Sequence, residues 1–167
     1  IGVNAGESAD VTVSGGSSLT LGQLCFSGNG GNATMEIIDG TVTSNGGGGG
    51  TSIGADDTYP LCGTNAVSSS RSSLLVYGAN SAFYSYSSSG NYATIGGNVA
   101  IQNGGRMEVH NSNVLMGSRA NIVVDGTGSL FFATGSYDPG IGGFGGQLTT
   151  DPMPDQDTSI TVANGGR

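Results

Sequence analysis

The stretch that decides the fold reads Val99-Ala100-Ile101-Gln102-Asn103-Gly104-Gly105-Arg106-Met107-Glu108-Val109. Two apolar-x-apolar triplets, which start eight residues apart, flank a polar corner that contains two glycines. Alternation with a period of two is typical of a strand, because successive side chains of a strand point to opposite faces. Asn and Gly at the corner permit the positive φ angles that a sharp turn requires. The stretch therefore predicts two short strands joined by a tight corner.

The same pattern recurs along the chain. Complete copies run over residues 11–21 and 122–132, looser copies start at Met35 and Leu75, and a half copy occupies residues 160–167. The six start positions, residues 11, 35, 75, 99, 122 and 160, differ by 24, 40, 24, 23 and 38 residues. Three of these intervals equal one coil of about 24 residues, and the other two equal one coil that carries an inserted loop.

A coil of two short strands cannot bury an apolar face alone, whereas coils stacked in register bury their alternating residues in one column. We therefore expect an all-β fold, a parallel β-solenoid (β-helix) of about six rungs, as a single domain or segment over residues 1–167 with inserted loops at 44–72 and 134–157. An antiparallel β-sandwich is the alternative, but it has no reason to keep this spacing. The predicted inward residues are Val11, Val13, Leu19, Leu21, Met35, Ile37, Leu75, Tyr77, Phe83, Val99, Ile101, Met107, Val109, Ile122, Val124, Leu130 and Phe132.

The charge of the chain excludes several classes of partner. The 167 residues include 33 Gly and 12 Asp or Glu but only four Arg and no Lys, for a net charge of -8. This balance offers no surface that could follow a phosphate backbone, so we expect no nucleic-acid binding. No apolar run approaches the roughly 20 residues that span a bilayer, so we expect no membrane insertion.

The two cysteines, Cys25 and Cys62, lie outside any metal-ligand spacing. They are either two buried thiols or one disulfide. We expect the disulfide and a secreted or cell-surface location, because acidic, Lys-free chains rich in Ser, Thr, Gly and Asn are usually exported. By the chain-entropy estimate, the bridge would contribute roughly 3–4 kcal/mol to stability.

The two ends of the sequence match one another. Residues 160–167 end in Asn-Gly-Gly-Arg, as residues 99–106 do, and the next apolar triplet would begin one position after Arg167. A second copy written after Arg167 supplies that triplet as Ile1-Gly2-Val3. Either subunits add head to tail into a filament, or the 167 residues are a piece of a longer solenoid, or the match is chance. The predicted assembly interface consists of Ile1, Val3, Val11, Val13, Ile160, Val162, Asn164, Gly165 and Gly166.

The inserted loops carry six of the twelve acidic residues, among them Asp56, Asp57, Asp151, Asp155 and Asp157. Oxygen ligands of this kind suit Ca²⁺, but neither loop has the spacing of a known calcium motif. We expect solvated acidic loops and no cofactor.

His110 is the single histidine. It would serve as a general base beside Glu108 or Asp125, or it would only form hydrogen bonds at a corner. A catalytic triad also needs a nucleophile, and the spacing singles out none of the many serines. We therefore do not expect an enzyme.

Aligning the copies places Thr20, Tyr84, Glu108 and Phe131 at one outward position, which is not a cluster of carboxylates. Together with Tyr86, the aromatic residues of this surface would stack on sugar rings or on a neighbouring fibre. A glycan or another receptor is therefore a possible partner beside self-association.

The repeats at residues 11–21 and 101–109 resemble the passenger regions of bacterial autotransporters and related secreted adhesins. The resemblance covers residues 9–43, 73–132 and 158–167, about two thirds of the chain. It implies a right-handed parallel β-solenoid displayed outside the cell, in adhesion, surface coating or fibre building. The preferred function is an extracellular structural protein that assembles head to tail into a filament or surface fibre by strand-edge pairing. The alternative is a segment of a secreted adhesin or carbohydrate-binding β-solenoid.

Overall fold

The computed structural model describes residues 7–26, 32–45, 51–54, 72–86, 92–111, 113–116, 120–134 and 159–167. These residues form strands, corners and short connections, without a helix. The strands are β1 (Ser8–Leu21), β2 (Leu24–Phe26), β3 (Asn32–Ser44), β4 (Thr51–Ile53), β5 (Ser73–Tyr77), β6 (Ala82–Tyr86), β7 (Tyr92–Ile95), β8 (Asn98–Gln102), β9 (Arg106–His110), β10 (Asn113–Met116), β11 (Asn121–Asp125), β12 (Leu130–Thr134) and β13 (Ser159–Ala163).

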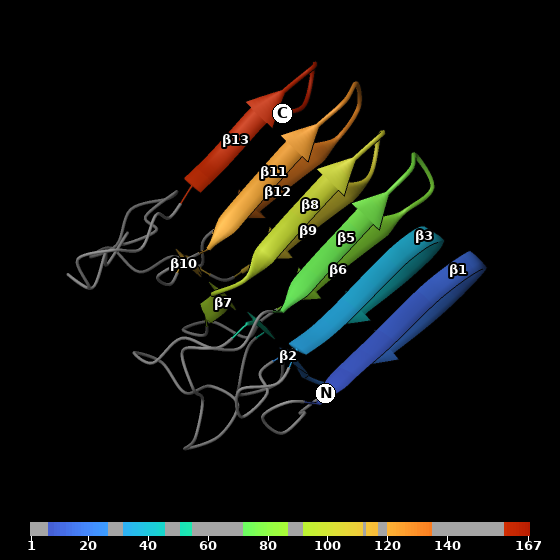
Figure 1. The fold of residues 1–167 in the computed structure, drawn as a ribbon, viewed down its shortest axis with the longest axis vertical. Coiled ribbons are helices and arrows are strands. Elements are labelled where there is room, and N and C mark those ends of the chain that lie inside the picture. Colours follow the sequence, from blue (N-terminus) through green and yellow to red (C-terminus); the bar gives the residue numbers. More distant parts are fainter. Residues whose placement is uncertain are drawn as a thin grey trace.

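Every described strand pair is parallel, and each strand pairs with the equivalent strand one coil away. The strands lie on three faces. The first face holds β5, β8, β11, β13 and the first halves of β1 and β3, and the second holds β6, β9, β12 and the second halves of β1 and β3. The third face holds β2, β4, β7 and β10. Figure 1 shows the successive coils stacked side by side from β1 to β13.

The fold is thus an all-β parallel β-solenoid, as the repeat predicts, and the antiparallel sandwich is excluded by the direction of every described pair. The prediction of about six rungs needs correction. Six strands do follow one another on the first face, but strands occupy all three faces in only about four turns. We number the coils rung 1 (β1, β2), rung 2 (β3, β4), rung 3 (β5–β7), rung 4 (β8–β10), rung 5 (β11, β12) and rung 6 (β13).

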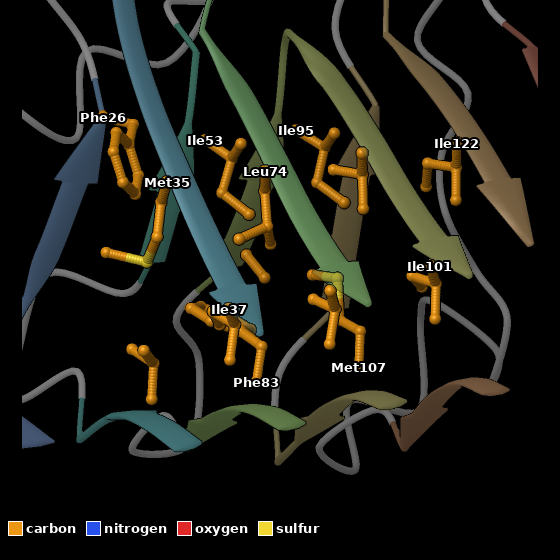
Figure 2. Packing of buried hydrophobic residues seen from close by; sticks show 14 of the residues in the cluster. Phe26, Met35, Ile37, Ile53, Leu74, Phe83, Ile95, Ile101, Met107 and Ile122 are labelled. Carbon is orange, nitrogen blue, oxygen red and sulfur yellow. The ribbon is translucent and has the colours of Figure 1, made fainter. Parts of the chain in front are cut away.

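The core is the column of inward residues, because parallel pairing in register places like residues directly above one another. On the first face Met35, Leu74, Val99 and Ile122 align in this way, and all are at most 1% exposed. Figure 2 shows such side chains pointing into the interior from facing strands. Phe26, Ile53 and Ile95 extend the core to the third face.

The inward assignment was wrong by one residue in the copy that starts near residue 75. Leu74 and Val76 point into the core, whereas Leu75 is half-buried and Tyr77 is 42% exposed. The cause is the corner at residues 78–81, which is one residue longer than the corner at residues 103–105.

The same shift affects the copy at residues 122–132. The corner between β11 and β12 has four residues, 126–129, so Phe131 rather than Leu130 aligns with Met107. Phe131 and Ala133 pack against the core, while Leu130 is half-buried and Phe132 is 42% exposed. At the first rung Val11, Leu19 and Leu21 are half-buried rather than enclosed, because β1 is an outermost strand of the described stack.

Candidate functional site

The corner after β13 repeats the corner after β8 in geometry as well as in sequence. Asn103 and Gly104 have φ angles of 51° and 89°, and Asn164 and Gly165 have φ angles of 50° and 82°. Asn164 also donates a side-chain hydrogen bond to Asp125 of rung 5 at 2.6 Å. The predicted interface residues Asn164 and Gly165 therefore form the turn that carries the chain from the first face to the second.

The last glycine of each of these corners lies against the rung before it. A Cβ added at Gly105 would lie 2.3 Å from the Val76 carbonyl oxygen, and one added at Gly166 would lie 2.5 Å from that of Val124. Only glycine lets the two backbones come this close, because both carbonyl oxygens belong to the backbone and cannot rotate away as a side chain would. Gly166 is therefore required for rung 6 to follow the same path as rung 4.

Arg167 already occupies the first position of the second face. Its N–H donates to the Ser129 carbonyl at 3.0 Å, as the N–H of Arg106 donates to the Ser81 carbonyl at 3.0 Å. Its own carbonyl accepts from the Phe131 N–H at 2.9 Å. Arg167 was not among the predicted interface residues, although its identity with Arg106 in the repeated Asn-Gly-Gly-Arg was a signal for this role.

On the first face, no described strand covers the inward side chains of rung 6. Ile160 and Val162 pair with Ile122 and Val124 and continue their column. Ile122 and Val124 are at most 1% exposed, but Ile160 is 44% and Val162 is 56% exposed. No strand in the described ranges lies beyond β13, which therefore presents both an apolar row and an unpaired backbone edge.

At the opposite end, β1 pairs only with β3 among the described strands. Val11 and Val13 align with Met35 and Ile37, so they belong to the same inward column as Ile160 and Val162. Val13 is buried and Val11 half-buried. Ile1 and Val3, the other predicted interface residues, lie outside the described residues.

The outer surface of the second face carries a cluster of aromatic and charged side chains. Parallel register places Tyr84, Glu108 and Phe132 in one column, and Tyr86 beside His110 in the next. Phe132 thus takes the place that the sequence alignment assigned to Phe131, because of the longer corner before β12.

Ring stacking links successive rungs on this surface. The rings of Tyr86 and His110 stack with centroids 4.9 Å apart and planes 11° apart, and His110 meets Phe132 in a tilted contact at 6.0 Å. Tyr84 stacks beside Tyr86 at 6.3 Å. One face of the Tyr86 ring is thereby occupied by His110, which leaves less aromatic surface for a sugar ring than the exposed fraction suggests.

Glu108 is held by two neighbours rather than presented to solvent. Arg106 contacts one carboxylate oxygen at 2.6 Å and His110 the other at 2.9 Å, and the Glu108 side chain is only 12% exposed. His110 therefore forms a hydrogen bond, which was one of the two roles predicted for it. Asp125, its other predicted neighbour, lies on β11 of the first face and accepts from Asn164.

Several predicted features lie outside the described residues, among them Cys62 and the acidic residues of the two inserted loops. Cys25 lies on β2 next to Ser52 of β4. Within the described ranges no group of three or more His, Cys, Asp or Glu residues is placed to hold a metal ion. The described part of the chain also contains no helix long and apolar enough to cross a membrane.

Comparison with protein-family models, curated proteins and solved structures returned no match for this chain.

Proposed function

We propose that the chain is an extracellular structural protein whose copies stack end to end into a filament or surface fibre. One observation carries this proposal: the buried column rises through every described rung and ends in Ile160 and Val162, which are 44% and 56% exposed. A soluble chain rarely leaves an apolar row and a free strand edge together, since such an edge pairs readily with another strand.

The mechanism is pairing of β13 with β1 of a second copy. Val11 of the incoming copy would lie over Ile160 and Val13 over Val162, so the parallel ladder and the column both continue. Completing the burial of a Val or Ile side chain contributes up to roughly 1.5–3 kcal/mol, less here because both are already partly covered. The contact is heterologous and does not close on itself, so repeated addition yields a fibre.

The same proposal includes a secreted or cell-surface location and a Cys25–Cys62 disulfide, in line with the resemblance to autotransporter passengers and secreted adhesins. It assigns the chain no catalytic role. Its partner is another copy of the chain.

A substitution at the open end tests the proposal. Val162→Asp places a carboxylate in the junction, where burial without a partner is costly, so the fibre should be lost while the monomer stays folded. Thr161→Asp is the matched control, because Thr161 is exposed on the outer side of the same strand. Sedimentation velocity and negative-stain microscopy would report the assembly, and circular dichroism the fold. Fibres formed equally by both variants would refute the proposal.

A carbohydrate-binding adhesin segment is the second candidate, favoured by Tyr86 and Phe132, which are 41% and 42% exposed beside Glu108 and Arg106. A glycan array with a sharp hit that Tyr84→Ala abolishes would support this function over assembly.

A further inference from the structure

A group of three buried hydroxyls interrupts the apolar core between the second and third faces. Ser44 of β3, Thr51 of β4 and Ser85 of β6 are at most 2% exposed. The Thr51 hydroxyl donates to Ser44 at 2.9 Å, and the Ser85 hydroxyl donates to Thr51 at 2.8 Å. The three oxygen atoms therefore form one hydrogen-bonded chain, which joins rung 2 to rung 3 inside the core.

These hydroxyls lie where other rungs have apolar side chains. On the second face, Ser44 and Ser85 belong to an inward column that continues with Val109 in rung 4. On the third face, Thr51 pairs in register with Leu24 of rung 1. Because a buried polar group costs free energy unless all of its hydrogen bonds are made, the bonding of this group can be counted atom by atom.

The two hydrogen bonds within the group leave one hydrogen atom over. Three hydroxyls carry three hydrogen atoms, and the two bonds use two of them. With the donors as above, the remaining hydrogen belongs to Ser44, for which the described residues provide no acceptor. Ser85, at the other end, accepts no hydrogen bond from them. The buried chain thus has an unused donor at one end and an unused acceptor at the other, and reversing both bonds only exchanges the ends.

We propose that one internal water molecule binds between Ser44 and Ser85 and closes the three hydroxyls into a four-membered ring. The water accepts the hydrogen of Ser44 and donates to the oxygen of Ser85. These two serines are register neighbours on adjacent parallel strands, which lie about 4.8 Å apart. A water about 2.8 Å from each oxygen spans that distance. The site lies within rungs 2 and 3 and is independent of the proposed assembly.

The neighbouring side chains in rung 3 are small. Ala93 pairs in register with Thr51 and is itself buried. In rung 4, the positions equivalent to Ser85 and Ala93 hold Val109 and Val114. Alanine lacks both methyl groups of valine, and serine has one heavy atom fewer than valine. Rung 3 can therefore accommodate a water where side chains fill rung 4.

A water suits this group better than a cation does. A cation binds only oxygen lone pairs, so it would leave the hydrogen of Ser44 without an acceptor. The buried polar residues of the described part of the chain are all Ser or Thr, so no buried carboxylate there would balance the charge. Water both donates and accepts, as the two ends of the chain require, and a buried water commonly makes about two to four hydrogen bonds.

Crystallography and NMR of the parent chain test the site directly. A high-resolution crystal structure should show a water within hydrogen-bond distance of both Ser44 Oγ and Ser85 Oγ. In solution, the methyl groups of Thr51 and Ala93 should show cross-relaxation with a long-lived water. Oxygen-17 relaxation dispersion of the solvent would count such waters independently.

Ser85→Val should remove the water, because valine lacks the acceptor and occupies the space, as Val109 does in rung 4. The water cross-peaks to Thr51 should then fall at least tenfold. Ser52→Ala is the matched control, since Ser52 is also buried on β4 but donates to the Gly54 carbonyl outside the group. The control should keep the cross-peaks, and circular dichroism would show that both variants are folded.

Three results would overturn the inference. A parent crystal structure in which the Ser44 hydroxyl bonds to a protein carbonyl, with no water beside it, would exclude the site. Density at metal–oxygen distances would assign it to a cation. Cross-peaks that persist in a folded Ser85→Val chain would place the water elsewhere. If Ser85→Val does not fold, the density and cross-peaks of the parent chain still decide, because they need no variant.

Discussion

The side-chain hydroxyl of Ser129 accepts a hydrogen bond from the backbone N–H of Gly104 at 3.0 Å, and so joins the corners of two successive rungs. The same hydroxyl donates to the carbonyl of Asp125 at 2.6 Å. Ser129 is fully buried and ends the four-residue corner of rung 5. A single side chain therefore closes its own corner and anchors it to the rung before it.

Ser81 repeats this arrangement in rung 3. Its hydroxyl accepts from the N–H of Asp39 at 2.7 Å and donates to the carbonyl of Tyr77. Ser81 is also buried, at 1% exposure, and also ends a four-residue corner. The serine is thus a feature of the longer corner type, and the three-residue corners use Asn-Gly-Gly in its place.

Ser129→Ala should lower the free energy of unfolding by about 1–3 kcal/mol, because it leaves the Gly104 N–H without its partner and removes one of the two hydrogen bonds that the Asp125 carbonyl accepts, the other coming from the Asn103 N–H. Urea unfolding followed by circular dichroism measures this loss. Ser18→Ala is the control, since Ser18 is exposed on β1 and its replacement should change stability by less than about 0.5 kcal/mol. Equal losses in the two variants would contradict the anchoring role.

Gly105→Ala should destabilise the fold by about 1–3 kcal/mol or more, because the added Cβ would lie 2.3 Å from the Val76 carbonyl oxygen and force the backbone apart. Gly22→Ala provides a contrast, since a Cβ at Gly22 would meet nothing within 4 Å. Its stability should be unchanged or slightly raised. Thermal unfolding of the two variants side by side decides the point, and a stable Gly105→Ala chain would argue against this close approach.

The coil and its strands were predictable because two independent signals agreed: the period-two alternation and the spacing near 24 residues. The Asn-Gly-Gly-Arg sequences at residues 103–106 and 164–167 are identical, and the two corners that they form have similar φ angles. The third face was not predicted. Its strands are short, three or four residues each, and their residues carry too few alternations to stand out from the loops.

The candidate site was predictable where the column repeats and not where a corner changes length. Ile160 and Val162 belong to a copy whose corner has three residues, and their predicted register with the rung below was correct. The role of Arg167 beside β12 was missed, although the repeated Asn-Gly-Gly-Arg marks Arg167 as the equivalent of Arg106, which makes the same backbone bond one coil pair earlier.

The proposed Cys25–Cys62 disulfide should, where it forms, stabilise the chain by roughly 3–4 kcal/mol, by the entropy lost from the unfolded state when the intervening loop is closed. Purified under oxidising conditions, the chain should show no thiol that reacts with iodoacetamide in denaturant. Reduction should then lower the urea midpoint, whereas Cys25→Ser should unfold at the same urea concentration with or without reductant. Two reactive thiols in the native, oxidised chain would exclude the bridge.

Phe131 and Phe132 give the most direct test of the corner that the sequence pattern misplaced. The four-residue corner turns Phe131 toward the core and leaves Phe132 42% exposed against His110. Phe131→Ala should therefore cost about 1–3 kcal/mol, below the roughly 3–5 kcal/mol of a fully buried Phe because Phe131 is half-buried. Phe132→Ala should cost less than about 1 kcal/mol, since it loses mainly one ring contact. Urea midpoints at an unchanged slope provide the comparison, with Phe83→Ala as the fully buried reference. If Phe132→Ala proved the more costly, the eight-residue spacing would hold in this rung, and Leu130 and Phe132 would face the core.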